Sequence, residues 1–270
     1  MDYNLKGKVA VITGAGGAIC GETAKLLAFE GASVAIWDIS IEAACKRRDE
    51  IRSSGCSAIA VECDVTEKIS AESALKETLR EYNTIDILIN GAGGSRKETT
   101  TSPDLEFFDI EQDAMERVIS LNYMSAVIPS QAVGRVFAEK RSGVILNISS
   151  ISGILPLTRT ISYSNAKAAV NNFTQWLAVH MAQNYSPKIR VNAIAPGFVL
   201  TEQNRFLLVD EKTGKVTERG QQILKNVPMA RYGEPLEIAN AALWLVSDMA
   251  SFISGAVIPV DGGFTAFPGV

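Results

Sequence analysis

The chain alternates short apolar runs with longer segments whose apolar residues recur at helical spacing. The short runs are typical of buried strands and fall at 8–13, 33–38, 57–62, 85–89, 144–148, 189–195 and 256–260. Helical spacing follows at 19–27, 41–53, 66–82, 113–139, 163–181 and 234–247. Strands that alternate with helices in this way predict an α/β fold, in which helices cover both faces of a doubly wound parallel sheet.

Two segments interrupt this alternation. Residues 95–112 are polar and irregular, and residues 198–227 are rich in loops and charges, with a turn predicted at 212–215. Each follows the end of a predicted strand, where loops often carry binding residues, so we expect both to border a substrate site. The chain contains no repeat and no Pro/Ser-rich linker, and residues 1–270 are predicted to form a single domain.

Composition narrows the class of protein. The 270 residues are 47% hydrophobic and carry a net charge of -4, with no basic block suited to nucleic acid or to an anionic membrane surface. The first eight residues lack a signal-peptide pattern, and no apolar run reaches the roughly 18 residues that a membrane span needs. Four cysteines without paired spacing predict reduced thiols in the cytoplasm, and the single histidine argues against a metal site.

A glycine cluster directly follows the first predicted strand. Gly14, Gly16 and Gly17 stand between that strand and a helical pattern, which is the layout of a phosphate-binding turn. Glycine lets the backbone approach a pyrophosphate, and a helix N-terminus offers N–H groups to it. The strict G-x-G-x-x-G spacing is absent, because Ile19 occupies the last position. A tight turn that binds no ligand remains an alternative.

An acidic residue ends the second predicted strand. Asp38 lies 24 residues after Gly14, a distance at which a carboxylate can bind the adenosine ribose of NAD and repel a 2′-phosphate. The glycine cluster and the residues directly after Asp38 offer no basic side chain for such a phosphate. We therefore predict NAD rather than NADP. The alternative is that Asp38 caps the next helix, although Ser40 can do so.

Tyr163 and Lys167 lie four residues apart at the start of a predicted helix, so their side chains share one face. An adjacent ammonium group favours the phenolate and lowers the pKa of a tyrosine, which then suits proton transfer. Ser150 lies 13 residues before Tyr163, at the end of a predicted strand. Such a pair occurs by chance in many helices, so its meaning depends on the rest of the chain.

These features together resemble the short-chain dehydrogenase/reductase family over nearly the whole chain, and the resemblance implies a Rossmann-like fold. The matching pieces are Thr13 with the glycine cluster, Asp38, Asp64-Val65, Asn90-Gly91-Ala92-Gly93, Asn122, Ser150, Tyr163 with Lys167, Pro196-Gly197 and Thr201. Two departures are clear. The last two glycines of the family's phosphate loop fall on Ala18 and Cys20, and Gly91 replaces the second Asn of the usual N-N-A-G.

The resemblance implies a role for each matching residue. Tyr163 would be the general acid or base, Lys167 would lower its pKa and hold the nicotinamide ribose, Ser150 would bind the substrate oxygen, and Asn122 would hold a water of the proton relay. Asp64 and Val65 would meet the adenine, and Thr201 would meet the carboxamide. The remaining implied cofactor contacts are Gly14, Gly16, Gly17, Ala18, Ile19, Asp38, Asn90, Gly91, Ala92, Pro196, Gly197 and Val199.

A narrower resemblance is to the D-mannonate oxidoreductases (fructuronate reductases), which interconvert D-fructuronate and D-mannonate. It is carried by residues 14–21, 90–94, 172–180 and 195–205. A sugar-acid carboxylate calls for a basic partner, because guanidinium binds it bidentately. The candidates are Arg96, Lys97, Arg159 and Arg205, and for each the alternative is a solvated surface charge.

Two further expectations and two alternative functions follow from the sequence. His180 and the stripe that contains Trp176 are expected in the core or in a subunit contact, and the family resemblance implies a homotetramer. Another enzyme reading is a dehydrogenase for a different polyol, an aldonate or a 3-oxoacyl thioester. A reading of another class is a dinucleotide-sensing protein without turnover, against which the complete set of Asn122, Ser150, Tyr163 and Lys167 argues.

Overall fold

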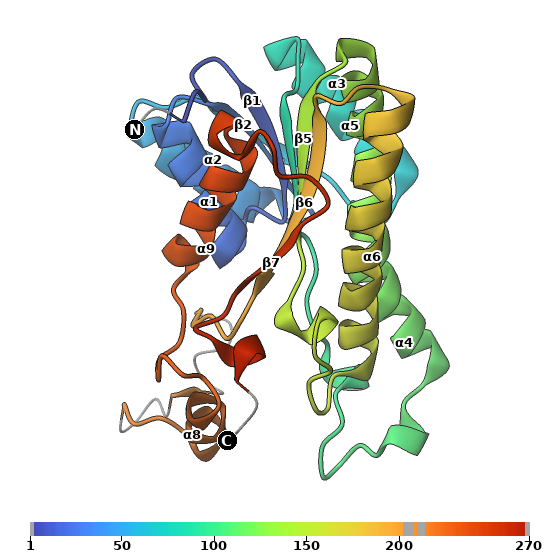
Figure 1. Cartoon of the computed structure of the whole chain (residues 1–270), viewed down its shortest axis with the longest axis vertical. Coiled ribbons are helices and arrows are strands. Elements are labelled where there is room, and N and C mark those ends of the chain that lie inside the picture. Colours follow the sequence, from blue (N-terminus) through green and yellow to red (C-terminus); the bar gives the residue numbers. More distant parts are fainter. Residues whose placement is uncertain (1–2, 202–207, 210–213, 268–270) are drawn as a thin grey trace.

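A seven-stranded parallel sheet forms the centre of the protein (Figure 1). The computed structural model describes residues 3–201, 208–209 and 214–267. The strand order is β3-β2-β1-β4-β5-β6-β7, so the direction of winding reverses between β1 and β4. The strands are β1 (Val9–Thr13), β2 (Ser33–Asp38), β3 (Ala58–Glu62), β4 (Ile87–Asn90), β5 (Gly143–Ile148), β6 (Ile189–Pro196) and β7 (Val257–Val260).

Helices cover both faces of this sheet, which confirms the predicted doubly wound, Rossmann-like single domain (Figure 1). One layer contains α1 (Ala18–Phe29), α2 (Ile41–Ser53) and α9 (Pro235–Val246), and the other contains α3 (Lys68–Tyr82), α5 (Ser125–Lys140) and α6 (Ile161–Asn184). Alternate residues of each strand face opposite layers. In β1, Ala10 and Ile12 join the core beneath α1 and α9, whereas Val9 and Val11 join the core beneath α5 and α6.

The sequence placed most strands and helices within two residues of their observed ends. Ser40 begins α2 by accepting a hydrogen bond from the Ala43 amide, as the sequence allowed. Thr66 does not cap α3, because its hydroxyl and its amide both donate to the Asp64 carboxylate. A helix within the predicted loop, α8 (Glu218–Lys225), was missed because its eight residues carry few apolar positions.

The predicted helix at 113–139 is interrupted, but not at Pro129, where a proline inside a helix would be expected to bend it. It consists of α4 (Gln112–Ile119), a π-helical turn at Ser120–Met124 and then α5. Pro129 lies inside α5, so the irregular turn falls at Asn122 rather than at the proline. Turns of this kind occur often at functional sites. No helix among the described residues combines the length and the apolar character that crossing a membrane requires.

Candidate active site

A cleft of about 870 Å³ opens at the carboxyl ends of the strands, where β1 and β4 lie side by side and the winding reverses. Ligands of open α/β sheets bind at such switch points. Most of the residues that the sequence singled out line this cleft. They are Gly14, Gly16, Gly17, Ala18, Ile19, Asp38, Asp64, Val65, Gly91, Ala92, Arg96, Ser150, Tyr163, Lys167, Pro196, Gly197, Val199 and Thr201.

Five predicted site residues are not among the lining residues. Lys97 and Arg159 are exposed outside the cleft, and Arg205 lies outside the described residues. Asn90 does not turn its side chain to the cleft, because its amide nitrogen donates to the Ala126 carbonyl and to the side chains of Ser130 and Asn147. Its amide therefore ties β4 to α5 and β5 beneath the cleft floor.

Asn122 is the fifth, and its side chain is also occupied. Its amide oxygen accepts from the Gly94 N–H at 2.9 Å, and its amide nitrogen donates to the carbonyls of Gly94 and Val118. The side chain, which is 1% exposed, therefore holds the glycine-rich exit of β4 against the π-helical turn. Both hydrogens of its amide nitrogen are used within the protein, so only the second lone pair of its amide oxygen is left on the side chain to hold a water.

The glycine turn after β1 fits a bound phosphate, because its glycines leave no room for side chains. Gly14 has φ +67°, and a Cβ there would lie 2.8 Å from the Ala92 Cα. A Cβ on Gly16 would lie 2.7 Å from the Ala43 Cβ and 2.9 Å from an Asp38 oxygen. Gly17 begins α1, whose first N–H groups have no partner within the helix and face this turn. The turn is therefore suited to a pyrophosphate.

Asp38 stands at the adenosine end of the cleft. One carboxylate oxygen accepts from the Gly16 N–H at 2.9 Å, and the other accepts from the Ser40 N–H at 3.0 Å. Each oxygen keeps a second lone pair for a ligand hydroxyl. Asp64 is fixed in the same way, since one of its oxygens accepts from both the amide and the hydroxyl of Thr66. Both carboxylates are thus held in place before a ligand arrives.

At the other end of the cleft, Lys167 is almost completely buried, with 4% of its surface exposed. Its ammonium nitrogen donates to the Ile148 carbonyl at 2.8 Å and lies 5.7 Å from the centre of the Tyr163 ring. Burial lowers the pKa of Lys167 to about 8, because the charged form loses its hydration. At neutral pH Lys167 is therefore charged, but a small rise in pH above about 8 makes it mostly neutral.

The Tyr163 phenol differs from the expectation drawn from the sequence. Burial raises the pKa of Tyr163 above its ordinary value, and the Ser150 hydroxyl beside it opposes that rise. The helical spacing correctly predicted that Lys167 lies near the ring, but the phenol is removed from water as well. At neutral pH Tyr163 is therefore a neutral phenol that can donate a proton.

Comparison with known proteins agrees with this geometry. The family model described as enoyl-(acyl carrier protein) reductase matches residues 14–265. An oxidoreductase of Haemophilus influenzae with no stated substrate is 41% identical, over 100% of this chain and 97% of that protein. The UxuB oxidoreductase of Bacillus subtilis is 40% identical, over 99% and 98%. A crystal structure with bound NAD, provisionally called a D-mannonate oxidoreductase of Haemophilus influenzae, has a TM-score of 0.92 at 42% identity, covering 99% and 98%.

The chain belongs to the short-chain dehydrogenase/reductase family. It is accordingly an oxidoreductase, as the sequence pattern predicted. All four of its cysteines are free thiols.

Two positions where this short-chain dehydrogenase/reductase departs from the usual family pattern lie in contact. A Cβ on Gly91 would fall 2.0 Å from the sulfur of Cys20, which is 4% exposed. The thiol of Cys20 thus occupies the space that a side chain at position 91 would need, and both residues line the cleft. The sequence showed two separate departures, and the structure shows that the glycine at position 91 leaves the space that the Cys20 thiol fills.

Other residues of the short-chain dehydrogenase/reductase cleft were not predicted. Ile39 follows Asp38 at the adenosine end, and Leu157 and Phe198 line the cleft from loops. The only sequence signal for Ile39 and Phe198 was that each directly follows a predicted site residue, Asp38 and Gly197 respectively. Leu157 had none, because a leucine in a loop has no pattern that separates a ligand contact from a surface position.

Proposed function

We propose that this protein is an NAD-dependent oxidoreductase that interconverts a hydroxyl and a ketone on a sugar acid, with D-fructuronate and D-mannonate as the pair. The observation that carries the proposal is one continuous cleft with a glycine turn and Asp38 at one end and Ser150, Tyr163 and Lys167 at the other. NAD(H), when bound there, would accept or supply the hydride. The protein's own residues then need only orient the substrate and move a proton.

Tyr163 carries the proton step. In ketone reduction its neutral phenol donates a proton to the substrate oxygen, and in alcohol oxidation its phenolate takes that proton back. Ser150 and Tyr163 together offer two O–H donors to the oxygen on which negative charge develops. Lys167 stabilises the phenolate by its charge and holds the nicotinamide ribose. Because burial favours the neutral phenol, Tyr163 carries the proton that ketone reduction needs.

Several features support NAD rather than NADP. The Asp38 carboxylate lies in the cleft beside the glycine turn, and Ile39 and Ser40, which also line the cleft, offer no positive charge. A 2′-phosphate at this position would meet the Asp38 charge without a compensating cation. The NAD bound in the Haemophilus influenzae structure, which matches this chain over 99% of its length, points the same way. We propose that the residues predicted from the sequence to contact the cofactor bind NAD.

Arg96 is the favoured partner of the substrate carboxylate. Of the candidates that the structure describes, it lines the cleft, whereas Lys97 and Arg159 do not. Arg96 belongs to the segment 95–112, which we propose to border the substrate together with 198–227. The name of the Haemophilus influenzae structure supports a sugar-acid substrate.

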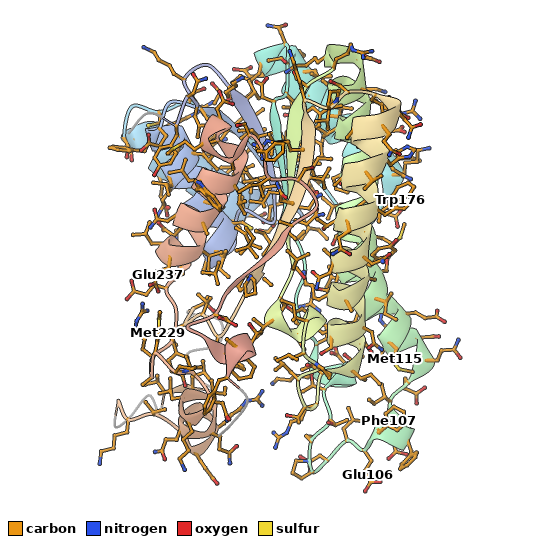
Figure 2. All side chains as sticks on the ribbon, viewed as in Figure 1. Glu106, Phe107, Met115, Trp176, Met229 and Glu237 are labelled. Atoms are coloured by element: carbon orange, nitrogen blue, oxygen red, sulfur yellow. The ribbon has the colours of Figure 1, made fainter. Side chains whose placement is uncertain are left out.

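We also propose a homotetramer that uses the outer face of α6. Trp176 and Val179 are 57% and 56% exposed there, and Figure 2 shows Trp176 directed away from the sheet. The Trp176 ring stacks on His180 with centroids 4.7 Å apart, far from the cleft. Trp176→Glu should place four charges in that contact and yield dimers or monomers in light scattering. A wild-type monomer would contradict the tetramer.

The test of function is NADH consumption by purified protein with D-fructuronate, D-tagaturonate and 5-ketogluconate, each repeated with NADPH. The proposal expects fast NADH-dependent turnover on fructuronate and at least ten times less with NADPH. Tyr163→Phe is the control for turnover by a contaminating enzyme. Turnover on another acid alone would keep the oxidoreductase and replace the substrate. Faster turnover with NADPH would overturn the cofactor assignment.

A further inference from the structure

Polar side chains join α6 to β5 along one face of the helix. Lys167, Asn171 and Thr174 follow at intervals of four and three residues, so they project from the same side. Lys167 donates to the Ile148 carbonyl, Asn171 accepts from the Ser149 hydroxyl, and Thr174 accepts from the Asn147 amide. The helix is therefore held to the strand that leads to Ser150 by directional bonds as well as by apolar contact.

Asn171 differs from the other two because it binds both ends of one short segment. Its amide oxygen accepts from the Ser149 hydroxyl at 2.5 Å, and its amide nitrogen donates to the Gly153 carbonyl at 3.0 Å. Between these two points lies Ser150, the proposed partner of the substrate oxygen. Replacing Asn171 would remove both of these bonds at once and leave the Ser149 hydroxyl with its longer bond to the Lys167 carbonyl, at 3.3 Å.

The segment also rests directly on the helix backbone. A Cβ on Gly153 would lie 2.6 Å from the Lys167 carbonyl carbon and 2.7 Å from its oxygen. Ser150 itself begins the 3-10 turn at Ile151–Gly153, with its oxygen accepting from the Ser152 amide at 3.2 Å. The direction of the Ser150 hydroxyl thus depends on how this turn sits on α6.

We propose that Asn171 is a positioning residue whose amide locks the Ser149–Gly153 segment onto α6 and so keeps the Ser150 hydroxyl beside the Tyr163 phenol. The inference rests on the proposed function, because it concerns the geometry of that proton-transferring pair. A displacement of about 1 Å in such a pair can cost on the order of 10²-fold in rate. Asn171 touches neither the substrate nor the cofactor in this account and acts through Ser150.

The competing explanation is that Asn171 only helps α6 to pack on the sheet. Loss of packing would lower the thermal midpoint and would reduce activity by the same factor whether or not Ser150 is present. A positioning role would instead vanish once Ser150 is removed, because there would be no hydroxyl left to position. Non-additivity with Ser150 therefore separates the two explanations.

The experiment compares Asn171→Ala, Ser150→Ala and the double variant, with whichever substrate the wild type turns over best. The neighbour Asn172 is exposed, so Asn172→Ala is the matched control and should retain wild-type kcat. Asn171→Ala should lower kcat about 10- to 100-fold and leave the Kd for NADH within about twofold of wild type. The double variant should match Ser150→Ala. Equal losses from Asn171→Ala in both backgrounds would overturn the proposal.

A second measurement needs no turnover. The Tyr163 phenol can be titrated by ultraviolet difference absorbance against Tyr163→Phe, in the wild type and in Asn171→Ala. The Ser150 hydroxyl opposes the rise in the pKa of Tyr163. Freeing Ser150 should therefore raise that pKa, and Asn172→Ala should leave it unchanged. An unchanged pKa in Asn171→Ala would overturn the positioning role, whereas a wild type inactive on every substrate would contradict the proposed function alone.

Discussion

The two ends of the cleft are built in opposite ways. At the dinucleotide end, glycine backbone is closely packed: Gly14 lies against the Ala92 backbone, Gly91 lies against the Cys20 thiol, and the Asp38 carboxylate accepts hydrogen bonds from two backbone amides. At the substrate end, the proposed partner of the substrate carboxylate, Arg96, comes from a loop and is exposed. Figure 2 shows Phe107 and Met229 on opposite sides of the lower part of the molecule, and 56% and 65% of their surfaces are exposed.

The difference between the two ends of the cleft indicates where substrate specificity can change. Closely packed backbone leaves little room for larger side chains. The dinucleotide end can therefore stay the same in enzymes that act on different substrates. Loops tolerate substitution, so the substrate end can vary while the scaffold stays fixed. Changes at the dinucleotide end should therefore alter cofactor affinity and stability together. Changes at the substrate end should alter KM for one substrate and nothing else.

The largest effect is expected at Tyr163, the proposed proton donor, which lines the cleft. Tyr163→Phe removes the proton donor and should lower kcat by about 10²–10⁴-fold, the usual contribution of general acid catalysis. NADH titrated by fluorescence should bind as it does to the wild type, because the ring and its contacts remain. Retention of more than about a tenth of the wild-type kcat would show that another group supplies the proton.

The next effect tests the substrate end. Arg96→Ala should raise KM for the sugar acid about 10- to 100-fold, since a hydrogen bond between charged groups contributes about 1.5–3 kcal/mol. The neighbouring Lys97→Ala is the control, because Lys97 carries the same charge but does not line the cleft. Initial rates over a range of substrate concentrations measure both. Equal effects of the two substitutions would mean that the charge acts only at long range.

The third prediction tests the dinucleotide end. Gly91→Asn places a side chain against the Cys20 sulfur and should destabilise the fold by about 1–3 kcal/mol, with weaker NADH binding. Adding Cys20→Gly should restore both properties, because it opens the space that the asparagine needs. Chemical denaturation and NADH titration measure the recovery. If the double variant is no better than Gly91→Asn, the two residues are not a matched pair.

The smallest expected change in stability concerns the buried charge of Lys167. The interval between about 8 and the ordinary 10.5 for the pKa of Lys167 corresponds to about 3 kcal/mol of cost for holding the charge. Lys167→Met removes that cost and also a hydrogen bond of about 1 kcal/mol, so at pH 7 it should stabilise the fold by about 1–2 kcal/mol while abolishing turnover.

The lowered pKa of Lys167 determines how the stability of the fold changes with pH. Because the folded-state pKa is lowered, the wild type gains stability as pH rises from about 8 towards 10.5, where Lys167 is neutral only in the folded state. The advantage of Lys167→Met should therefore shrink between pH 7 and pH 10 in denaturant titrations. A variant less stable than the wild type at pH 7 would contradict this account of Lys167.

The sequence by itself determined the alternation of strands and helices, the glycine turn and the residues that line most of the cleft. These follow from local rules: side-chain period fixes the element, and glycine marks places where backbone must come close. The assignment of Asp38, Tyr163 and Lys167 to one site came instead from the resemblance to the short-chain dehydrogenase/reductase family, which implied it before any contact was known. Helix α8 escaped the same rules because its eight residues include only two large apolar side chains, Ile223 and Leu224.

Only the tertiary structure decided what depends on contacts between distant segments. The amide nitrogens of Asn90 and Asn122 are occupied by internal hydrogen bonds, Cys20 meets Gly91, and Asn171 binds both ends of the Ser150 segment. The pKa of Tyr163 is raised rather than lowered for the same reason, since burial is a property of the whole fold. Spacing along a chain shows which residues can share a face, whereas desolvation and close packing arise only when the faces meet.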